Sequence, residues 1–186
     1  LRLFTIQHLI KSHEPEPAPA VAREIDPQGI ILHYSDTPSR YGKERVDAAY
    51  IDRMHAHDHP RWAVLYKGKV YHIGYHYVIL PDGAIERGRP DHCIGAHARH
   101  FNNWLGICLV GAFATSCPRD WWPRAPTVEQ RKSLIGLCER LMSEYHIPPE
   151  RIKRHRDVGD TLCPGERFPY ALIMEILREY RREHPV

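Results

Sequence analysis

The 186-residue sequence has little net charge, no long apolar run and no closely spaced pair of cysteines. Lysine and arginine number 26 and aspartate and glutamate 23, which leaves a net charge of +3 spread along the chain. Nucleic-acid binding needs a clustered basic surface, so we expect no nucleic-acid partner. A membrane helix needs about 18 consecutive apolar residues, and no stretch supplies them, so we expect no membrane span in this chain.

The cysteines do not form a disulfide framework. There are five of them, an odd number in a chain of ordinary domain size, and no CxxC pair is present. Zinc-ribbon and thioredoxin-like folds are therefore unsupported, and at least one thiol must stay unpaired or take another role. We expect buried thiols at Cys93, Cys108 and Cys138, and the sequence leaves open a bridge between Cys93 and Cys117.

Histidine, by contrast, is abundant. The chain has 14 histidines, while 42% hydrophobic and 26% charged residues are ordinary for a globular protein. Imidazole is both the commonest metal ligand and an acid or base in the physiological pH range. Such a count favours a metal site or an acid–base site over a purely structural role.

The first residues differ in composition from the rest. Residues 12–23 read SHEPEPAPAVAR, which is typical of an extended linker. We therefore expect an N-terminal arm and Pro/Ala/Glu-rich linker over 1–27 and one domain over 28–186. The linker suits tethering to an upstream anchor or domain, which favours an extracytoplasmic location over a cytoplasmic one.

The remaining pattern predicts a single α/β domain with a central mixed sheet flanked by about three helices. Alternating and continuous apolar runs indicate the strands, and apolar residues at helical spacing indicate the helices. The helix that starts at the capping box of Thr127 and Gln130 has the clearest signal. The expected strands lie at 29–34 and 105–113, with hairpins at 64–73 and 75–88. The other expected helices span 43–55 and about 169–183, the latter with Leu172, Ile173, Ile176, Leu177 and Tyr180 inward.

One segment combines two metal-ligand types. Residues 155–163 read HRDVGDTLC, and His33 ends an apolar strand, so His155, Cys163 and His33 can form a three-ligand zinc site. A metal-free cysteine hydrolase is the alternative, with Cys163 as the nucleophile and His155 or His97 as its base. The cluster His55, His57 and His59 is interpreted as a solvated helix end rather than a second metal site.

Four ordered motifs resemble one known family. They are IILHYSDTP (30–38), IGYHYVILPDGAIERGRP (73–90), GAHARHFNNWLGICLVG (95–111) and HRDVGDTLCPG (155–165). Over residues 28–180 the chain resembles N-acetylmuramoyl-L-alanine amidases of the bacteriophage-lysozyme and peptidoglycan-recognition-protein type. The resemblance implies the amidase fold, a zinc ion and peptidoglycan or a muropeptide as substrate. It further implies hydrolysis of the amide between the lactyl group of N-acetylmuramic acid and L-alanine.

The resemblance also implies residue roles. It makes His33, His155 and Cys163 the zinc ligands, Tyr75 and Thr161 catalytic residues, and His97, Asn102 and Asn103 substrate-binding residues. Thr161 stands where the phage enzymes carry lysine and the recognition-type amidases commonly carry threonine. A recognition module of the same fold that binds without cleaving is the alternative. The presence of Cys163 favours the enzyme, because non-catalytic members usually lack this cysteine.

Two features depart from the family pattern. The sequence reads Asn103-Trp104-Leu105-Gly106 where the family usually has Asn-Ser-Ile-Gly. The segment from His57 to Tyr71 is longer than the usual short turn, and we interpret it as a surface insertion rather than a change in substrate reach.

Overall fold

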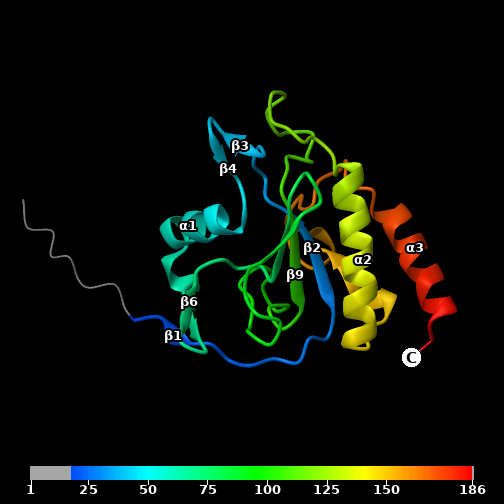
Figure 1. Cartoon of the computed structure of the whole chain (residues 1–186), viewed down its shortest axis with the longest axis horizontal. Helices are drawn as coiled ribbons and strands as arrows, with labels where there is room; N and C mark the ends of the chain where they lie inside the picture. The colour runs from blue at the N-terminus through cyan, green and yellow to red at the C-terminus, as the bar shows by residue number, and fades with distance from the viewer. Residues whose placement is uncertain (1–17, 186) are drawn as a thin grey trace, which may run out of the picture.

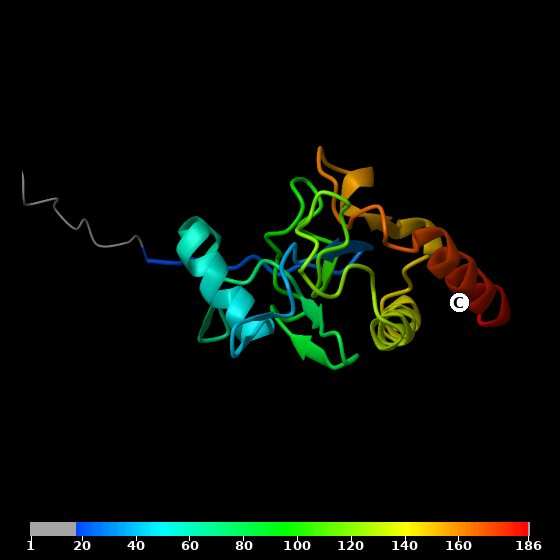
Figure 2. The same ribbon diagram turned by 90° about the horizontal axis from the view of Figure 1, so that it is seen from above.

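A computed structural model of the chain describes residues 18–185. Most of the predicted N-terminal arm and linker, residues 1–17, lies outside the described residues. A five-stranded sheet forms the middle layer, with α1 on one side and α2 and α3 on the other (Figures 1 and 2). This arrangement confirms the predicted α/β domain with a mixed sheet and three flanking helices.

The main sheet has the order β10-β2-β9-β7-β8. Its first four strands are parallel to their neighbours, and β8 is antiparallel to β7. The central strand β9 is buried along its whole length, as its continuous apolar sequence predicts. The strands are β2 (Ile30–Tyr34), β7 (Tyr77–Ile79), β8 (Ile85–Arg87), β9 (Leu105–Leu109) and β10 (Ile152–Arg154).

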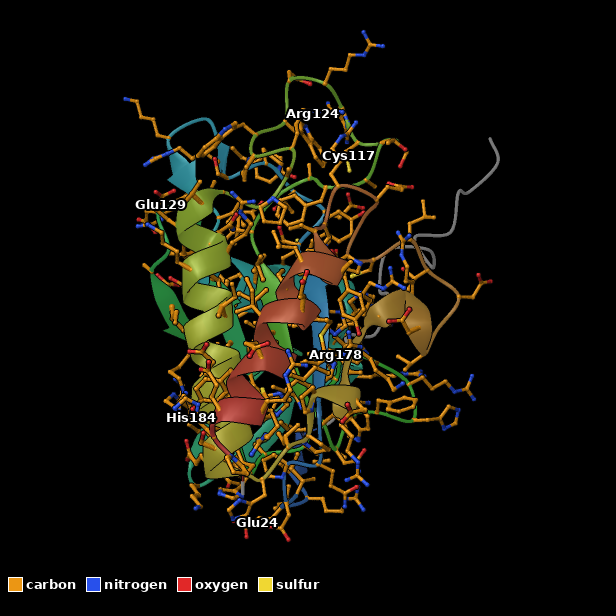
Figure 3. All side chains as sticks on the ribbon, turned by 90° about the vertical axis from the view of Figure 1, so that its right-hand side faces the viewer. Glu24, Cys117, Arg124, Glu129, Arg178 and His184 are labelled. Atoms are coloured by element: carbon orange, nitrogen blue, oxygen red, sulfur yellow. The ribbon has the colours of Figure 1, made fainter. Side chains whose placement is uncertain are left out.

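Helices α2 (Val128–Glu144) and α3 (Tyr170–Glu183) lie side by side over one face of the sheet (Figure 3). The capping box forms as predicted: the Thr127 hydroxyl accepts from the Gln130 backbone N–H, and the Gln130 side chain accepts from the Thr127 N–H. The inward face of α3 differs from the prediction. Leu172 and Ile176 are exposed, whereas Met174 is buried together with Ile173 and Leu177.

Helix α1 (Ala48–Asp58) covers the opposite face. It starts later than predicted because Asp47 caps its first turn by accepting from the Tyr50 N–H. It also ends later than predicted, at Asp58. Residues 43–47 instead contribute to a short hairpin of β3 (Arg40–Tyr41) and β4 (Glu44–Arg45). The apolar side of α1 packs with Val46, Ile73 and Val110 against the sheet.

The predicted hairpin at 64–73 forms a small sheet of its own. Strand β5 (Val64–Tyr66) pairs with β6 (Lys69–Tyr71) and, in parallel, with β1 (Ala20–Val21). The buried guanidinium of Arg89 joins this insertion to the domain, because it donates to the carbonyls of Trp62, Ile73 and Ile94 at 2.6, 2.6 and 2.7 Å.

Two points that the sequence analysis raised, the membrane span and the possible Cys93–Cys117 bridge, concern the described residues. Between residues 18 and 185, no helix combines the length and apolar character needed to cross a bilayer. All five cysteines lie in this part of the chain and are free thiols, so no bridge joins Cys93 to Cys117.

Candidate metal centre

Three side chains that are far apart in the sequence meet at one end of the central strands. His33 lies in β2, His155 begins the 3-10 turn His155–Asp157 directly after β10, and Cys163 follows eight residues later. One ligand atom from each lies within 4.8 Å of the others. Within residues 18–185 this is the one group of three histidine, cysteine or acidic side chains with such geometry.

The spacing of these donors fits a tetrahedral zinc ion. The Nδ1 atom of His33 lies 3.6 Å from the Sγ atom of Cys163. Zinc bonds of about 2.1 Å to nitrogen and 2.3 Å to sulfur at a tetrahedral angle place the two donors about 3.6 Å apart. Two imidazoles and one thiolate also form a donor set that suits zinc and leaves a fourth position open.

Local hydrogen bonds hold the cysteine loop against β2. Parallel pairing of β10 with β2 places the start of the loop beside His33. The Arg156 backbone N–H donates to the Cys163 carbonyl at 2.9 Å and closes the loop. From β2, the Tyr34 N–H donates to the Cys163 sulfur at 3.4 Å, so the thiol points toward the strand rather than toward solvent.

Burial determines the chemistry of the free thiol. Desolvation is the main cause that raises the pKa of Cys163 to about 12, and the charge of Asp36 adds to it. A nucleophilic cysteine needs a lowered pKa, because the thiolate is the reactive form. This burial argues against the metal-free cysteine hydrolase. It leaves Cys163 as a candidate ligand, whose thiol would lose its proton on binding a metal.

Tyr75 lies next to the cluster. The centre of its ring is 5.1 Å from that of His33. Burial raises the pKa of its hydroxyl well above the usual 10, with further contributions from thiolate charge at Cys108 and Cys163. The hydroxyl is thus a hydrogen-bond donor at every physiological pH.

His97 lies behind His33. Its Nδ1 atom is 3.0 Å from Nε2 of His33, and its own Nε2 is 3.0 Å from the Trp104 carbonyl oxygen. The Asn102 side-chain oxygen accepts from the backbone N–H groups of His97 and Ala98 at 2.8 and 3.0 Å. A substrate contact through a ring nitrogen of His97 would have to break one of these hydrogen bonds.

The remaining predicted residues, Thr161 and Asn103, differ in their contact with the three metal-ligand candidates. The hydroxyl of Thr161 accepts from the Cys163 N–H at 3.2 Å, so Thr161 belongs to the cysteine loop. Asn103 lines a cavity of about 210 Å³ with Arg23, Asp26 and Gln28, apart from the three metal-ligand candidates. The substrate-binding roles of Asn102 and Asn103 stay predictions.

Sequence reasoning misjudged one histidine of the cluster His55, His57 and His59. His55 is buried rather than solvated: its Nδ1 accepts from the Gly74 N–H at 3.1 Å, and its ring lies 5.5 Å from that of Tyr75. Its neighbours His57 and His59 are exposed as predicted, His57 with 90% of its side chain accessible. A usable signal existed, since His55 follows the buried Ile51 by four residues on the same helix face.

Comparisons with known proteins converge on one family. A sequence profile described as N-acetylmuramoyl-L-alanine amidase matches residues 23–166. The endolysin of Enterobacteria phage T3 is 34% identical over 94 residues, which cover 50% of this chain and 59% of the endolysin. The chain thus spans 59% of the length of that curated relative.

Solved structures extend the similarity to most of the fold. The endolysin amidase LysCS from Clostridium intestinale is 32% identical with a TM-score of 0.63, covering 81% of this chain and 83% of that one. A variant of Drosophila PGRP-LB in complex with tracheal cytotoxin is 26% identical with a TM-score of 0.62, covering 83% and 85%.

Proposed function

The chain belongs to the N-acetylmuramoyl-L-alanine amidase family, and on this premise we propose that it is a zinc-dependent amidase of peptidoglycan. The proposed reaction hydrolyses the amide between the lactyl group of N-acetylmuramic acid and L-alanine. The observation that carries the proposal is the convergence of His33, His155 and Cys163, with the ring of Tyr75 next to that of His33.

Each residue of the proposed site has its own role in the reaction. When bound by His33, His155 and Cys163, zinc would supply a Lewis acid and lower the pKa of a water molecule. The Tyr75 hydroxyl stays protonated because burial raises its pKa, so it can donate to the carbonyl oxygen as negative charge develops there. The Thr161 hydroxyl accepts from the Cys163 N–H, which leaves its own proton free to donate to substrate.

The recognition module is the second candidate. The solved structures similar to this chain include a Drosophila PGRP-LB variant in complex with tracheal cytotoxin, so binding of a muropeptide fits the same fold. The complete donor set of the cluster favours the enzyme, because binding alone does not need a cysteine beside two histidines. We propose the wall polymer or its fragments as substrate and an extracytoplasmic site of action.

Mass spectrometry of digested sacculi tests the proposal. The full chain loaded with zinc should release stem peptides with a free L-alanine amino group and glycan with a free lactyl carboxylate. A chelator should stop the release and added zinc should restore it. Intact sacculi after incubation with the zinc-loaded protein would favour the recognition module.

Paired cysteine variants test the metal. Elemental analysis should find one zinc per chain, and Cys163→Ser should lose both zinc and activity. Cys117→Ser is the matched control, since its sulfur donates to Asp36 at 3.0 Å and a serine hydroxyl can do the same. Activity that persists in metal-free protein would instead support the metal-free cysteine hydrolase.

A further inference from the structure

The two nitrogens of the His33 ring face different partners. Nδ1 faces the sulfur of Cys163 at 3.6 Å, on the side where the metal-ligand candidates meet. Nε2 faces Nδ1 of His97 at 3.0 Å, a hydrogen-bond distance between two buried rings. In this hydrogen bond, either Nε2 of His33 donates a proton to Nδ1 of His97 or the reverse holds.

The Trp104 carbonyl determines the direction of the hydrogen bond between His33 and His97. A carbonyl oxygen only accepts, so Nε2 of His97, 3.0 Å away, carries the proton of that neutral ring. Nδ1 of His97 is then an acceptor, which makes Nε2 of His33 the donor. It follows that Nδ1 of His33 is unprotonated and presents its lone pair toward Cys163.

The backbone holds the His97 ring in this place. A Cβ atom added to Gly95 would lie 2.5 Å from Cδ2 of His97, and one added to Gly106 would lie 2.6 Å from the same atom. Two glycines from different segments therefore leave just enough room for the ring. The Asn102 side chain fixes the backbone of His97 from a third direction.

We propose that His97 is a positioning residue that sets the tautomer and orientation of His33 before the metal binds, by passing a hydrogen bond from His33 to the Trp104 carbonyl. The inference rests on the zinc site of the proposed function. Partners of this kind change metal affinity by 10- to 100-fold in metalloproteins. The role differs from substrate contact, because it acts through His33 alone.

Two variants separate the hydrogen bond from the bulk of the ring. His97→Asn places an amide oxygen near the position of Nδ1 and keeps an acceptor for His33, while His97→Leu fills similar space without one. Competition with a chromophoric chelator should show zinc binding 10- to 100-fold weaker in His97→Leu. His97→Asn should recover most of that loss, and the exposed His57→Leu should bind zinc like the unchanged chain.

Long-range ¹H–¹⁵N spectra of the metal-free full chain read the tautomer directly. His33 should carry its proton on Nε2 in the unchanged protein and in His97→Asn, and should lose this preference in His97→Leu. A proton on Nδ1 of His33 in the unchanged protein would overturn the inference even if no variant folds. Zinc affinity of His97→Leu within twofold of the unchanged chain would overturn it too.

Neither measurement uses peptidoglycan. A protein that gives these spectra and affinities but cuts no amide keeps the inference and loses the proposed activity. A protein that cuts the amide while His33 prefers the other tautomer keeps the activity and loses the inference.

Discussion

Acid should destabilise this protein through His76, a histidine that the proposed chemistry does not use. The His76 side chain is fully buried beside the central sheet. Its Nε2 donates to the Cys93 carbonyl at 2.8 Å, and its Nδ1 accepts from the Gly106 N–H at 2.9 Å. The bond from Gly106 needs the neutral ring, because a proton on Nδ1 would face another donor.

The pKa of His76 gives the size of the effect. Burial lowers it from 6.5 to about 4. The unfolded chain therefore binds a proton that the folded chain refuses between these two values, and stability falls as pH falls through this window. At 1.36 kcal/mol per pKa unit, the contribution lost at pH 5 is about 2 kcal/mol relative to pH 7, and at pH 4 and below it approaches about 3 kcal/mol.

Comparing the free energy of unfolding of the unchanged chain with that of His76→Gln at two pH values separates the contribution of His76 from those of the other buried histidines. Urea unfolding of the metal-free chain and of His76→Gln should be followed by circular dichroism at pH 7 and pH 5. The variant is less stable at pH 7, and its deficit should shrink by about 2 kcal/mol at pH 5. His57→Gln, changed at an exposed ring, is the matched control for the substitution itself. An unchanged deficit of His76→Gln, or an NMR titration of His76 near 6.5, would refute the argument.

Four further substitutions test other parts of the structure. Tyr75→Phe should keep zinc and lower kcat about 100-fold, because one donor to a developing oxyanion is lost; elemental analysis with single-turnover kinetics checks both. Arg89→Met should lower the free energy of unfolding by about 3 kcal/mol, since three buried carbonyls lose a charged donor, and thermal and urea unfolding measure it. Gly106→Ala should weaken zinc binding by displacing the His97 ring, whereas Gly136→Ala, with open space around the new methyl group, should stabilise α2 by up to about 1 kcal/mol. Equal zinc affinity in these two glycine variants would contradict the packing argument.

The elements that could be predicted are those with local signals. The capping box at Thr127 and the buried run of β9 each depend on residues close in sequence. The capping box formed where expected, and the strand formed over Leu105–Leu109 of the expected 105–113. The order β10-β2-β9-β7-β8 depends on pairing between residues more than 70 positions apart, such as Ile30 with Leu105. No local pattern contains that information, and neither does the pairing of β1 with β5.

Helix faces were predicted less well than helix positions. The sequence of α3 carries eight hydrophobic residues, tyrosines included, over more than half its circumference, and periodicity does not say which edge meets α2. The partner helix decides this, so Met174 is buried while Leu172 and Ile176 stay exposed. His55 was misjudged for the opposite reason, because two exposed histidines beside it suggested that all three face solvent.

The site shows the same division between local and distant information. The three metal-ligand candidates could be named from two motifs, because one contains His33 and the other contains both His155 and Cys163. The role inferred for His97 could not, because it depends on two distances of 3.0 Å that join β2, the loop after Ala96 and the entry to β9. A sequence indicates which donors exist, but the direction of a hydrogen bond between two histidines follows from a third partner.

The third partner, the backbone carbonyl of Trp104, explains why the departure from the family pattern at this residue is compatible with the metal site. The hydrogen bond from His97 uses the backbone carbonyl of Trp104, which any side chain at this position would supply. The indole ring packs instead over Gly29, where an added Cβ would lie 2.4 Å from a ring carbon. The change from the small residue usual in the family to tryptophan is therefore accommodated by Gly29 before β2, and the path from His33 through His97 to the carbonyl is unaffected. Gly29→Ala should consequently disturb packing at the start of β2 more than it disturbs zinc affinity.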